Sequence, residues 1–267
     1  MRALGPARYA VGEAAGLGVW ALSRRRRLAA ANHRRLDPGI DEREARRRAR
    51  RSYREYGRTV VDFLWGIDLD AATVTRCTHL HGLEDLLAVR DAGRGAIIVL
   101  GHFGSWDMCA NVAAVHGIPL STVMSPVGPP AITDLVIWAR ESNQLEVFTP
   151  ERAARGLVRA LRRGRFVCLL CDIPGGGPTV VVDYCGGPVA FTTAPAVLAR
   201  VTGAPIFPID SHRSRDGYEI VVQPPVVVEP GEDDTTVMQR VAVSLERVVR
   251  RHPEQWYPFG QVYADER

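Results

Sequence analysis

The 267-residue sequence contains no lysine, and all 34 of its basic residues are arginines. It also has no long apolar run. The stretch at 9–22 is mildly apolar but carries Glu13 and several glycines, and 14 residues are too few to span a bilayer. An arginine cluster (24–27) follows this stretch, whereas the positive charges of a cleaved signal peptide come first. The stretch is therefore predicted to be an interfacial helix or a helix docked on the rest of the chain.

Several signatures of common enzyme classes are absent. No G-x-S-x-G elbow occurs, which argues against an α/β-hydrolase. No G-x-G-x-x-G follows the first expected strand and no P-loop is present, which argues against dinucleotide binding and kinase-like ATP chemistry. The five cysteines are odd in number and scattered, so a disulfide framework is not expected. This cysteine usage predicts a cytoplasmic, reducing location. Cys168 and Cys171 lie in one apolar strand, whose alternating sides separate the two thiols.

Charge is distributed unevenly along the chain. Residues 1–60 hold 16 arginines and 6 acidic residues, while the remaining 207 hold 18 arginines and 24 acidic residues. A basic segment predicts attraction to an anionic partner, such as the inner face of the membrane or an acidic carrier protein. Nucleic acid is not expected, because no helix-turn-helix, zinc finger or aromatic platform accompanies the arginines. The helix expected at 41–65 carries many of them opposite an apolar face made of Ala45, Ala49, Tyr53, Tyr56, Val60 and Leu64.

Strands and helices alternate after this basic beginning. Apolar runs predict strands at 95–100, 118–124, 145–148, 166–171, 179–184, 206–209 and 218–222, the last of them antiparallel. Helices are predicted at 84–89, 131–141, 151–163, 193–202 and 235–250, and from Ser105 onward. The expected fold class is α/β, with a mainly parallel central sheet flanked by helices on both faces and a basic helical N-terminal segment. A single domain (1–267) is expected, with a basic helical prologue (1–65) and an α/β catalytic core (95–262).

One stretch places chemistry at the edge of this sheet. The apolar run that begins at Gly95 stops at Gly101, so His102 lies at the carboxyl end of a central strand, where open α/β sheets bind ligands. His102 can accept a proton, and Asp107 in the first turn of the next helix could fold back to orient it. Two alternatives are a hydrogen-bonded loop histidine and a metal ligand. No metal site is expected, because the nearest further ligand, His116, falls near the far end of that helix.

Residues 102–107 resemble the H-x-x-x-x-D/E (HX4D) block of the lysophospholipid acyltransferase superfamily. Further blocks occur in the order found in its lipid A late acyltransferase and phosphatidylinositol mannoside acyltransferase branch. These blocks are Tyr56-Gly57, Leu161-Arg162-Arg163-Gly164, the D-F-F-G-x-P-like 183–188, Thr202-Gly203-Ala204-Pro205 and the P-E-Q-W at 253–256. The order of the blocks makes the resemblance specific over most of the chain.

The resemblance implies transfer of a fatty acyl group from acyl-CoA or acyl carrier protein to a hydroxyl or amine acceptor, with no cofactor besides that co-substrate. His102 would act as general base, with Asp107 holding its imidazole. Backbone N–H groups near Gly104 or Gly186 are candidate donors to the oxyanion, and Arg140 could bind a phosphate. The expected substrate-binding residues are Gly104, Ser105, Trp106, Arg140, Glu151, Asp172, Asp183 and Gly186.

Two departures from the family pattern stand out. Asp172-Ile173-Pro174 replaces the frequent D-R/Q-D, and Val181 stands where the mannoside branch carries a glutamate that Glu151, Asp172 or Asp183 would have to replace. The departures leave open a specialised acceptor and two alternative functions. One is a non-catalytic member that binds lipid or acyl carrier protein, and the other is a thioesterase that uses water as acceptor.

Overall fold

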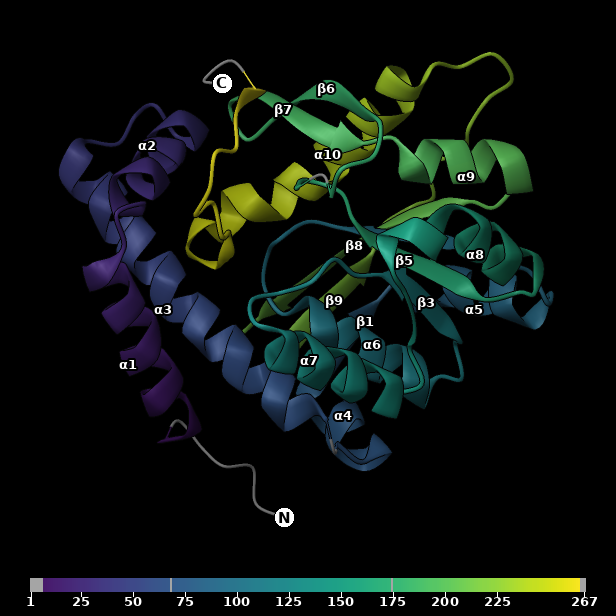
Figure 1. Ribbon diagram of the computed structural model, residues 1–267, viewed down its shortest axis with the longest axis horizontal. Coiled ribbons are helices and arrows are strands. Elements are labelled where there is room, and N and C mark those ends of the chain that lie inside the picture. Colours follow the sequence, from purple (N-terminus) through teal and green to yellow (C-terminus); the bar gives the residue numbers. More distant parts are fainter. Residues whose placement is uncertain (1–6, 68, 174, 265–267) are drawn as a thin grey trace.

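A computed structural model describes residues 7–67, 69–173 and 175–264. Its centre is a seven-stranded sheet with strand order β1-β9-β8-β2-β5-β3-β4 (Figure 1). All neighbouring strands are parallel except β8 and β9, which confirms the mainly parallel sheet and the antiparallel strand near its end. The strands are β1 (Thr78–His81), β2 (Ile97–Leu100), β3 (Leu120–Val123), β4 (Glu146–Phe148), β5 (Phe166–Leu170), β8 (Ile206–Arg213) and β9 (Tyr218–Val222).

Helices cover both faces of the sheet, as the unbroken apolar runs predict. Along β2, Ile97 and Val99 pack into one core, and Ile98 and Leu100 pack into the other. The first core is closed by α8 (Pro150–Arg162), α9 (Ala194–Thr202) and α10 (Asp234–Arg251). The second is closed by α4 (Ala71–Cys77), α5 (Leu83–Asp91) and α6 (Trp106–Val115). α7 (Pro130–Ser142) buries only Ala139, and the 3-10 turn η1 (Pro253–Gln255) follows α10.

Residues 179–184 form a strand, but not in the central sheet. β6 (Thr179–Tyr184) pairs antiparallel with β7 (Gly187–Thr192), a strand that sequence analysis missed, to make a separate two-stranded ribbon. The turn between them uses positive φ angles at Cys185 (52°) and Gly186 (91°). Val182 and Tyr184 are buried while Val181 and Asp183 are exposed. This alternation is typical of a ribbon with one covered face rather than of a central parallel strand.

Three helices make up the basic N-terminal segment: α1 (Ala7–Leu22), α2 (Arg26–Leu36) and α3 (Glu42–Gly66). α3 begins where predicted, because the Asp41 side chain caps it by accepting from the Glu44 backbone N–H at 2.7 Å. α1 lies along α3 at the left of Figure 1. A Cβ atom at Gly57 would be 1.9 Å from the Gly12 carbonyl oxygen, so two glycines permit this close contact. Of the two predictions for this stretch, the structure shows the docked helix.

The expected apolar face of α3 is buried only in its first half. Ala45, Ala49 and Tyr53 are buried, but the later members of that face are exposed: Tyr56 by 39%, Val60 by 43% and Leu64 by 51%. The second half of the helix instead buries polar side chains, namely Glu55, Thr59 and Asp62. This half buries its acidic side because Arg213, from β8, inserts beneath it and pairs with Asp62 at 2.5 Å and with Glu55 at 3.2 Å.

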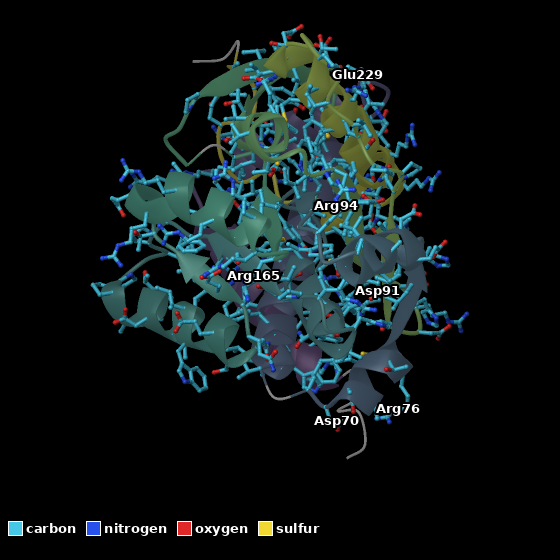
Figure 2. The ribbon with its side chains drawn as sticks, turned by 90° about the vertical axis from the view of Figure 1, so that its right-hand side faces the viewer. Asp70, Arg76, Asp91, Arg94, Arg165 and Glu229 are labelled. Atoms are coloured by element: carbon cyan, nitrogen blue, oxygen red, sulfur yellow. The ribbon has the colours of Figure 1, made fainter. Side chains whose placement is uncertain are left out.

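Charged side chains on the face away from α1 and α3 include both signs. Figure 2 shows that side, where the labelled residues are Asp70, Arg76, Asp91, Arg94, Arg165 and Glu229. The exposed arginine cluster at 24–27 carries positive charge alone, and it lies in the turn between α1 and α2 and at the start of α2. In the described ranges, no helix combines the length and the apolar character that crossing a membrane requires.

Candidate active site

His102 and Asp172 form the centre of the site. Strands β2 and β5 are neighbours, and their register pairs Leu100 with Leu170, so the residues two positions further on emerge together at the carboxyl edge. The Asp172 carboxylate accepts a hydrogen bond from His102 Nδ1 at 2.7 Å through Oδ1. It accepts a second from the His102 backbone N–H at 2.8 Å through Oδ2. One carboxylate therefore holds both the ring and the backbone of the histidine.

This pairing leaves one ring nitrogen open. Because Asp172 accepts at Nδ1, it favours the tautomer with the proton on Nδ1 and the lone pair on Nε2. Nε2 has no hydrogen-bond partner in the described part of the chain. The His102 side chain is 30% exposed and the Asp172 side chain only 5%. The arrangement can therefore accept a proton at Nε2 while a buried carboxylate balances the positive charge that results.

Gly101 allows the carboxylate to approach this closely. A Cβ atom built at Gly101 would lie 3.3 Å from Asp172 Oδ2 and 3.4 Å from the Tyr184 hydroxyl. A side chain at this position would therefore press on both groups. Tyr184 is buried, and burial raises its pKa well above the ordinary value. The sequence assigns this tyrosine no role, because it is predicted only as the last residue of the strand at 179–184 and as part of the 183–188 block.

Asp107 does not reach His102. It lies in the first turn of α6 and accepts from Arg140 Nε, on α7, at 3.2 Å, with Arg140 Nη2 3.1 Å away. Burial raises the pKa of Asp107, and the Arg140 guanidinium opposes that rise. The interpretation of Asp107 as the group that orients the imidazole is therefore corrected, since Asp172 occupies that place. Arg140 has a charged partner and a side chain only 16% exposed, so it is not a solvated surface arginine.

The loop after His102 is held in place by hydrogen bonds that its backbone N–H groups donate to other segments. The Gly104 N–H donates to Gln255 O at 2.8 Å, and the Ser105 N–H donates to Ser211 O at 2.9 Å. Gly104 has φ +61°, and a Cβ there would lie 1.9 Å from Ser211 O, so the loop requires glycine. Ser105 makes no side-chain cap to α6. Since its N–H is already used, Gly104 does not present the expected oxyanion donor.

Gly186 also lies away from the expected position. It is at the β6–β7 turn, where a Cβ atom would be 2.1 Å from Arg35 O of α2. Arg35 Nε donates to Gly186 O at 3.4 Å. This glycine therefore packs the ribbon against the N-terminal helices and is not placed beside His102.

An aromatic cluster borders the histidine. The Trp106 ring meets the His102 ring edge-on with centroids 5.6 Å apart, and lies 6.0 Å from the Tyr257 ring. Tyr56 of α3 contacts Tyr257 at 5.2 Å. Trp106 and Tyr257 thus connect the His102–Asp172 pair to Tyr56, which is exposed on α3.

The remaining carboxylates lie elsewhere. Glu151 is exposed at the start of α8, which follows β4, and β4 is three strands from β2, or about 14 Å at the usual strand spacing. A hydrogen bond from Thr149 lowers the pKa of Glu151. Asp183 is exposed on β6, where its backbone exchanges hydrogen bonds with the Gln239 side chain at 2.8 and 2.9 Å. Val181 is 53% exposed. Of the three acids expected to replace the family glutamate, only Asp172 lies against His102.

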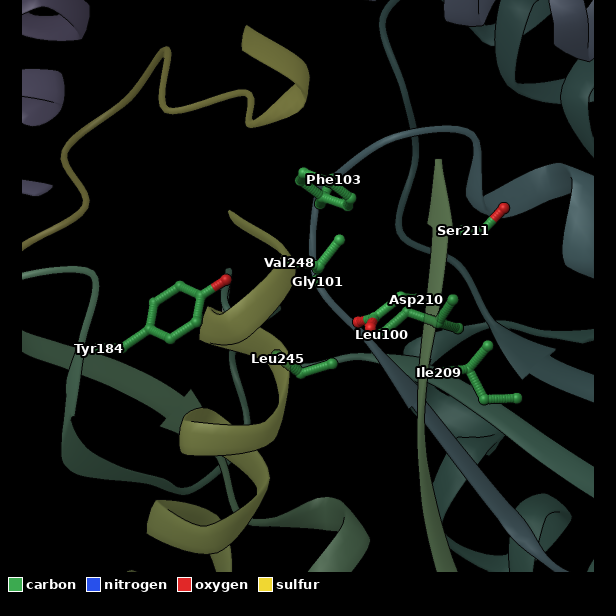
Figure 3. Close-up of a pocket in the computed structure, with 9 residues that line it drawn as sticks. All are labelled: Leu100, Gly101, Phe103, Tyr184, Ile209, Asp210, Ser211, Leu245 and Val248. Atoms are coloured by element: carbon green, nitrogen blue, oxygen red, sulfur yellow. The ribbon is translucent and has the colours of Figure 1, made fainter. Parts of the chain in front are cut away.

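A small cavity of about 10 Å³ lies behind Gly101. Figure 3 shows the Tyr184 ring on one side with its hydroxyl toward the other lining residues, and Asp210 of β8 on the opposite side. Neither the Tyr184 hydroxyl nor Asp210 Oδ1 has a hydrogen-bond partner among the described residues. Burial raises the pKa of Asp210 to about 7, although Gln223 donates to its Oδ2 at 3.0 Å. A carboxyl group that titrates near neutral pH therefore lies in the strand beside β2.

The cysteines are all unbridged. Cys168 packs in the core on one face of the sheet and Cys171 in the core on the other, which confirms that the two thiols point apart. Burial raises the pKa of Cys109 to about 12, so this thiol is a packing group at neutral pH. Across the described residues, no three His, Cys, Asp or Glu side chains are grouped so that they could hold a metal ion.

The α/β fold, with a carboxylate-held histidine at the carboxyl edge of its sheet, is consistent with the acyltransferase class that the sequence blocks indicate. Residues 3–263 match the family described as bacterial lipid A biosynthesis acyltransferase, and the chain belongs to that family. The match covers nearly the whole chain, including the basic helices that precede the sheet. The family expected from the ordered sequence blocks is confirmed.

Particular relatives fall in the two branches that the resemblance named. Phosphatidylinositol mannoside acyltransferase of Mycolicibacterium smegmatis is 29% identical over 179 residues, 66% of this chain and 59% of that protein. The Mycobacterium tuberculosis protein of the same name is 30% identical over 182 residues, 67% of this chain and 57% of that protein. Lipid A biosynthesis lauroyltransferase of Escherichia coli is 26% identical over 248 residues, 90% of this chain and 80% of that protein. The chain thus matches somewhat under three fifths of the length of the mannoside acyltransferases.

Proposed function

We propose that the protein transfers a fatty acyl group from a thioester, either acyl-CoA or an acylated carrier protein, to a hydroxyl or amine group of a lipid or glycolipid acceptor. Membership of an acyltransferase family supports the class of reaction. The names of the relatives point to a phosphatidylinositol mannoside or a lipid A precursor as acceptor. The observation that carries the proposal is the clamp of Asp172 on His102, which leaves Nε2 open.

The reaction follows from that geometry. His102 Nε2 takes the proton of the acceptor hydroxyl as its oxygen attacks the thioester carbonyl carbon. The tetrahedral intermediate collapses, the carbon–sulfur bond breaks, and the leaving thiolate takes the proton back from the imidazolium. Asp172 keeps the ring oriented and balances its charge, in the manner of the carboxylate of a serine protease triad. No acyl-enzyme forms, so the chain needs no nucleophilic serine.

We assign Asp107 and Arg140 a different part in the same site. Their ion pair joins α6, which starts beside His102, to α7. Their side chains are only 18% and 16% exposed, so the pair is poorly screened by solvent. In this proposal it fixes the wall of the site next to Trp106 and leaves proton transfer to His102.

The proposal also places the protein at an anionic membrane surface, where a lipid acceptor would be found. The 24–27 arginines are exposed and can interact with phospholipid head groups. Asn143 at the end of α7 donates to the carbonyl of Gly66 at the end of α3, so the two helices meet there. Both carry exposed apolar side chains: Tyr56, Val60 and Leu64 on α3, and Ile132, Leu135 and Trp138 on α7. A surface that carries both exposed apolar side chains and exposed arginines suits the interface of an anionic bilayer.

The test measures thiol release from palmitoyl-CoA and acyl transfer to a phosphatidylinositol mannoside acceptor. The His102→Ala variant should lose about 10²–10⁴-fold in turnover, because the general base is gone. Asp172→Asn should lose a similar factor, because the amide cannot hold the same tautomer. Asp183→Asn makes the same change at an exposed aspartate and serves as the control, so its turnover should remain within about twofold of wild type.

The Asp107→Asn variant distinguishes the role of Asp107 from that of Asp172. It leaves Arg140 without its buried partner, so we expect a lower free energy of unfolding, while Asp172→Asn keeps the fold and loses turnover. Normal turnover in Asp172→Asn, with a folded but inactive Asp107→Asn, would show that the assignment is wrong. Thiol release that needs no acceptor would identify a thioesterase. Lipid binding without turnover, unchanged in His102→Ala, would identify a non-catalytic member.

A further inference from the structure

The paired helices α1 and α3 divide the carboxyl edge of the sheet into two regions. α3 crosses the loop after β2, where Thr59 Oγ1 donates to Gly104 O at 3.0 Å. It also crosses the end of β8, where Arg213 Nη2 donates to Glu55 O at 2.9 Å. His102 and its aromatic cluster lie along the Tyr56 side of the helix. A separate cleft lies on the other side, between α3 and the β8–β9 turn.

This second cleft has the size of a ligand site. Its volume is about 710 Å³, within the range of about 300–1,000 Å³ that small-molecule sites occupy. It also lies at the edge of the sheet where α/β proteins bind ligands. Three of the lining residues are acidic, Glu55, Asp216 and Glu254. Six are arginines, so the lining carries an excess of positive charge: Arg8, Arg51, Arg54, Arg58, Arg213 and Arg215.

The inner arginines are already held in place. The Arg213 side chain is only 8% exposed and is fixed by Asp62 at 2.5 Å and Glu55 at 3.2 Å. Arg58 Nη1 lies 3.2 Å from the same Glu55 carboxylate. The Arg8 guanidinium lies 3.9 Å from the centre of the Trp65 ring. Guanidinium groups fixed in this way lose little conformational entropy when an anion binds.

The arginines still have unused capacity to donate. Arg8, Arg54 and Arg213 each carry a buried Nε–H that has no partner in the described part of the chain. Buried donors without an acceptor are rare in proteins, and a bound water or anion would satisfy them. Arg51 on α3 and Arg215 in the β8–β9 turn are exposed on opposite walls. Neither forms an ion pair with any described residue.

We propose that this cleft is a second site, separate from His102, that binds a phosphate-bearing anion. Phosphate offers several acceptor oxygens in the geometry that arginine forks recognise, and its charge would balance the exposed guanidinium groups of Arg51 and Arg215. Arg51 and Arg215 would close on it from the two walls, with Arg213 at the base. The proposal does not depend on the acyltransferase reaction. The phosphate belongs either to a soluble ligand or to a lipid head group.

Two binding measurements test the site with the full chain. Calorimetry follows inorganic pyrophosphate as the soluble probe, and sedimentation follows vesicles of phosphatidylglycerol as the head-group probe. The Arg51→Gln/Arg215→Gln pair should weaken binding at least about tenfold, because two charge-assisted contacts are lost. The control pair Arg159→Gln/Arg162→Gln removes the same charge from the exposed face of α8 and should change binding by less than about twofold.

The results distinguish a soluble phosphate ligand from a lipid head group. A selective loss of pyrophosphate binding in the cleft pair supports a soluble ligand, and a selective loss of vesicle binding supports a lipid head group. Equal losses in the cleft and control pairs would show only a general charge effect and would overturn the site. Failure of the wild-type protein to bind either probe would overturn it as well.

Discussion

Replacing Asp210 by asparagine should change how the stability of the protein depends on pH. Asp210 is buried on β8 beside the 10 Å³ cavity, with one carboxylate oxygen bound to Gln223 and the other without a partner among the described residues. Burial raises its pKa from 3.8 to about 7, more than the arginines Arg247 and Arg251 lower it. The folded state therefore binds this proton more tightly than the unfolded chain does.

The sign and size of the effect follow from linkage. Because the folded-state pKa is raised, the free energy of unfolding falls as pH rises from about 4 to about 7 and is level above that. A pKa raised from 3.8 to about 7 corresponds to about 4 kcal/mol, with a slope of about 1.4 kcal/mol for each pH unit. Between about pH 5.5 and pH 8, wild type should thus lose about 2 kcal/mol relative to Asp210→Asn.

Urea denaturation of both proteins across this pH range measures the difference directly, because the other titrating groups cancel between them. Asp85→Asn, which removes an exposed carboxyl group on α5, serves as the control for the loss of one charge. Parallel curves for wild type and Asp210→Asn would refute the reasoning, because they would show that this carboxyl titrates alike in the folded and unfolded states.

Two further predictions concern stability. Tyr184→Phe should leave the free energy of unfolding within about 1 kcal/mol of wild type or raise it, because its buried hydroxyl has no partner in the described ranges. Tyr218→Phe should lower the free energy of unfolding by about 1.5–3 kcal/mol, because that hydroxyl donates to Asp62 at 2.6 Å. Urea titrations that show the same loss of stability in Tyr184→Phe and Tyr218→Phe would contradict this prediction. Gly57→Ala should cost about 1–3 kcal/mol and expose α1 to limited proteolysis, because its Cβ would lie 1.9 Å from a carbonyl oxygen of α1. Gly18→Ala, whose Cβ meets nothing within 4 Å, should stabilise by up to about 1 kcal/mol, and a protease-resistant Gly57→Ala would show that the contact is not tight.

Features that depend on local pattern could be predicted. The unbroken apolar run before Gly101 predicts a strand covered on both faces, and Ile97 and Ile98 indeed pack into opposite cores. The capping aspartate at 41 predicts the start of α3. His102 lies two residues past the end of β2, so its place at the carboxyl edge needs no knowledge of other elements. Each of these properties is set by side chains within a few residues of one another.

Features that depend on distant partners could not be predicted. The second half of α3 has an apolar pattern, yet Arg213 lies beneath it and pairs with two of its acids. The strand at 179–184 lies outside the central sheet because its partner is the next strand, β7. Neither outcome is visible in the spacing of residues along one element.

The chain by itself thus determined that a histidine stands at the carboxyl end of a buried strand, because strand burial and strand ends are local properties. Only the tertiary structure decided which acid serves that histidine. Asp107, five residues away, is turned by the first turn of α6 toward Arg140, while Asp172, seventy residues away, arrives because β5 lies beside β2 in register. Strand order in a parallel sheet is fixed by how the helices pack on its faces, and that packing brings together atoms that the sequence holds far apart.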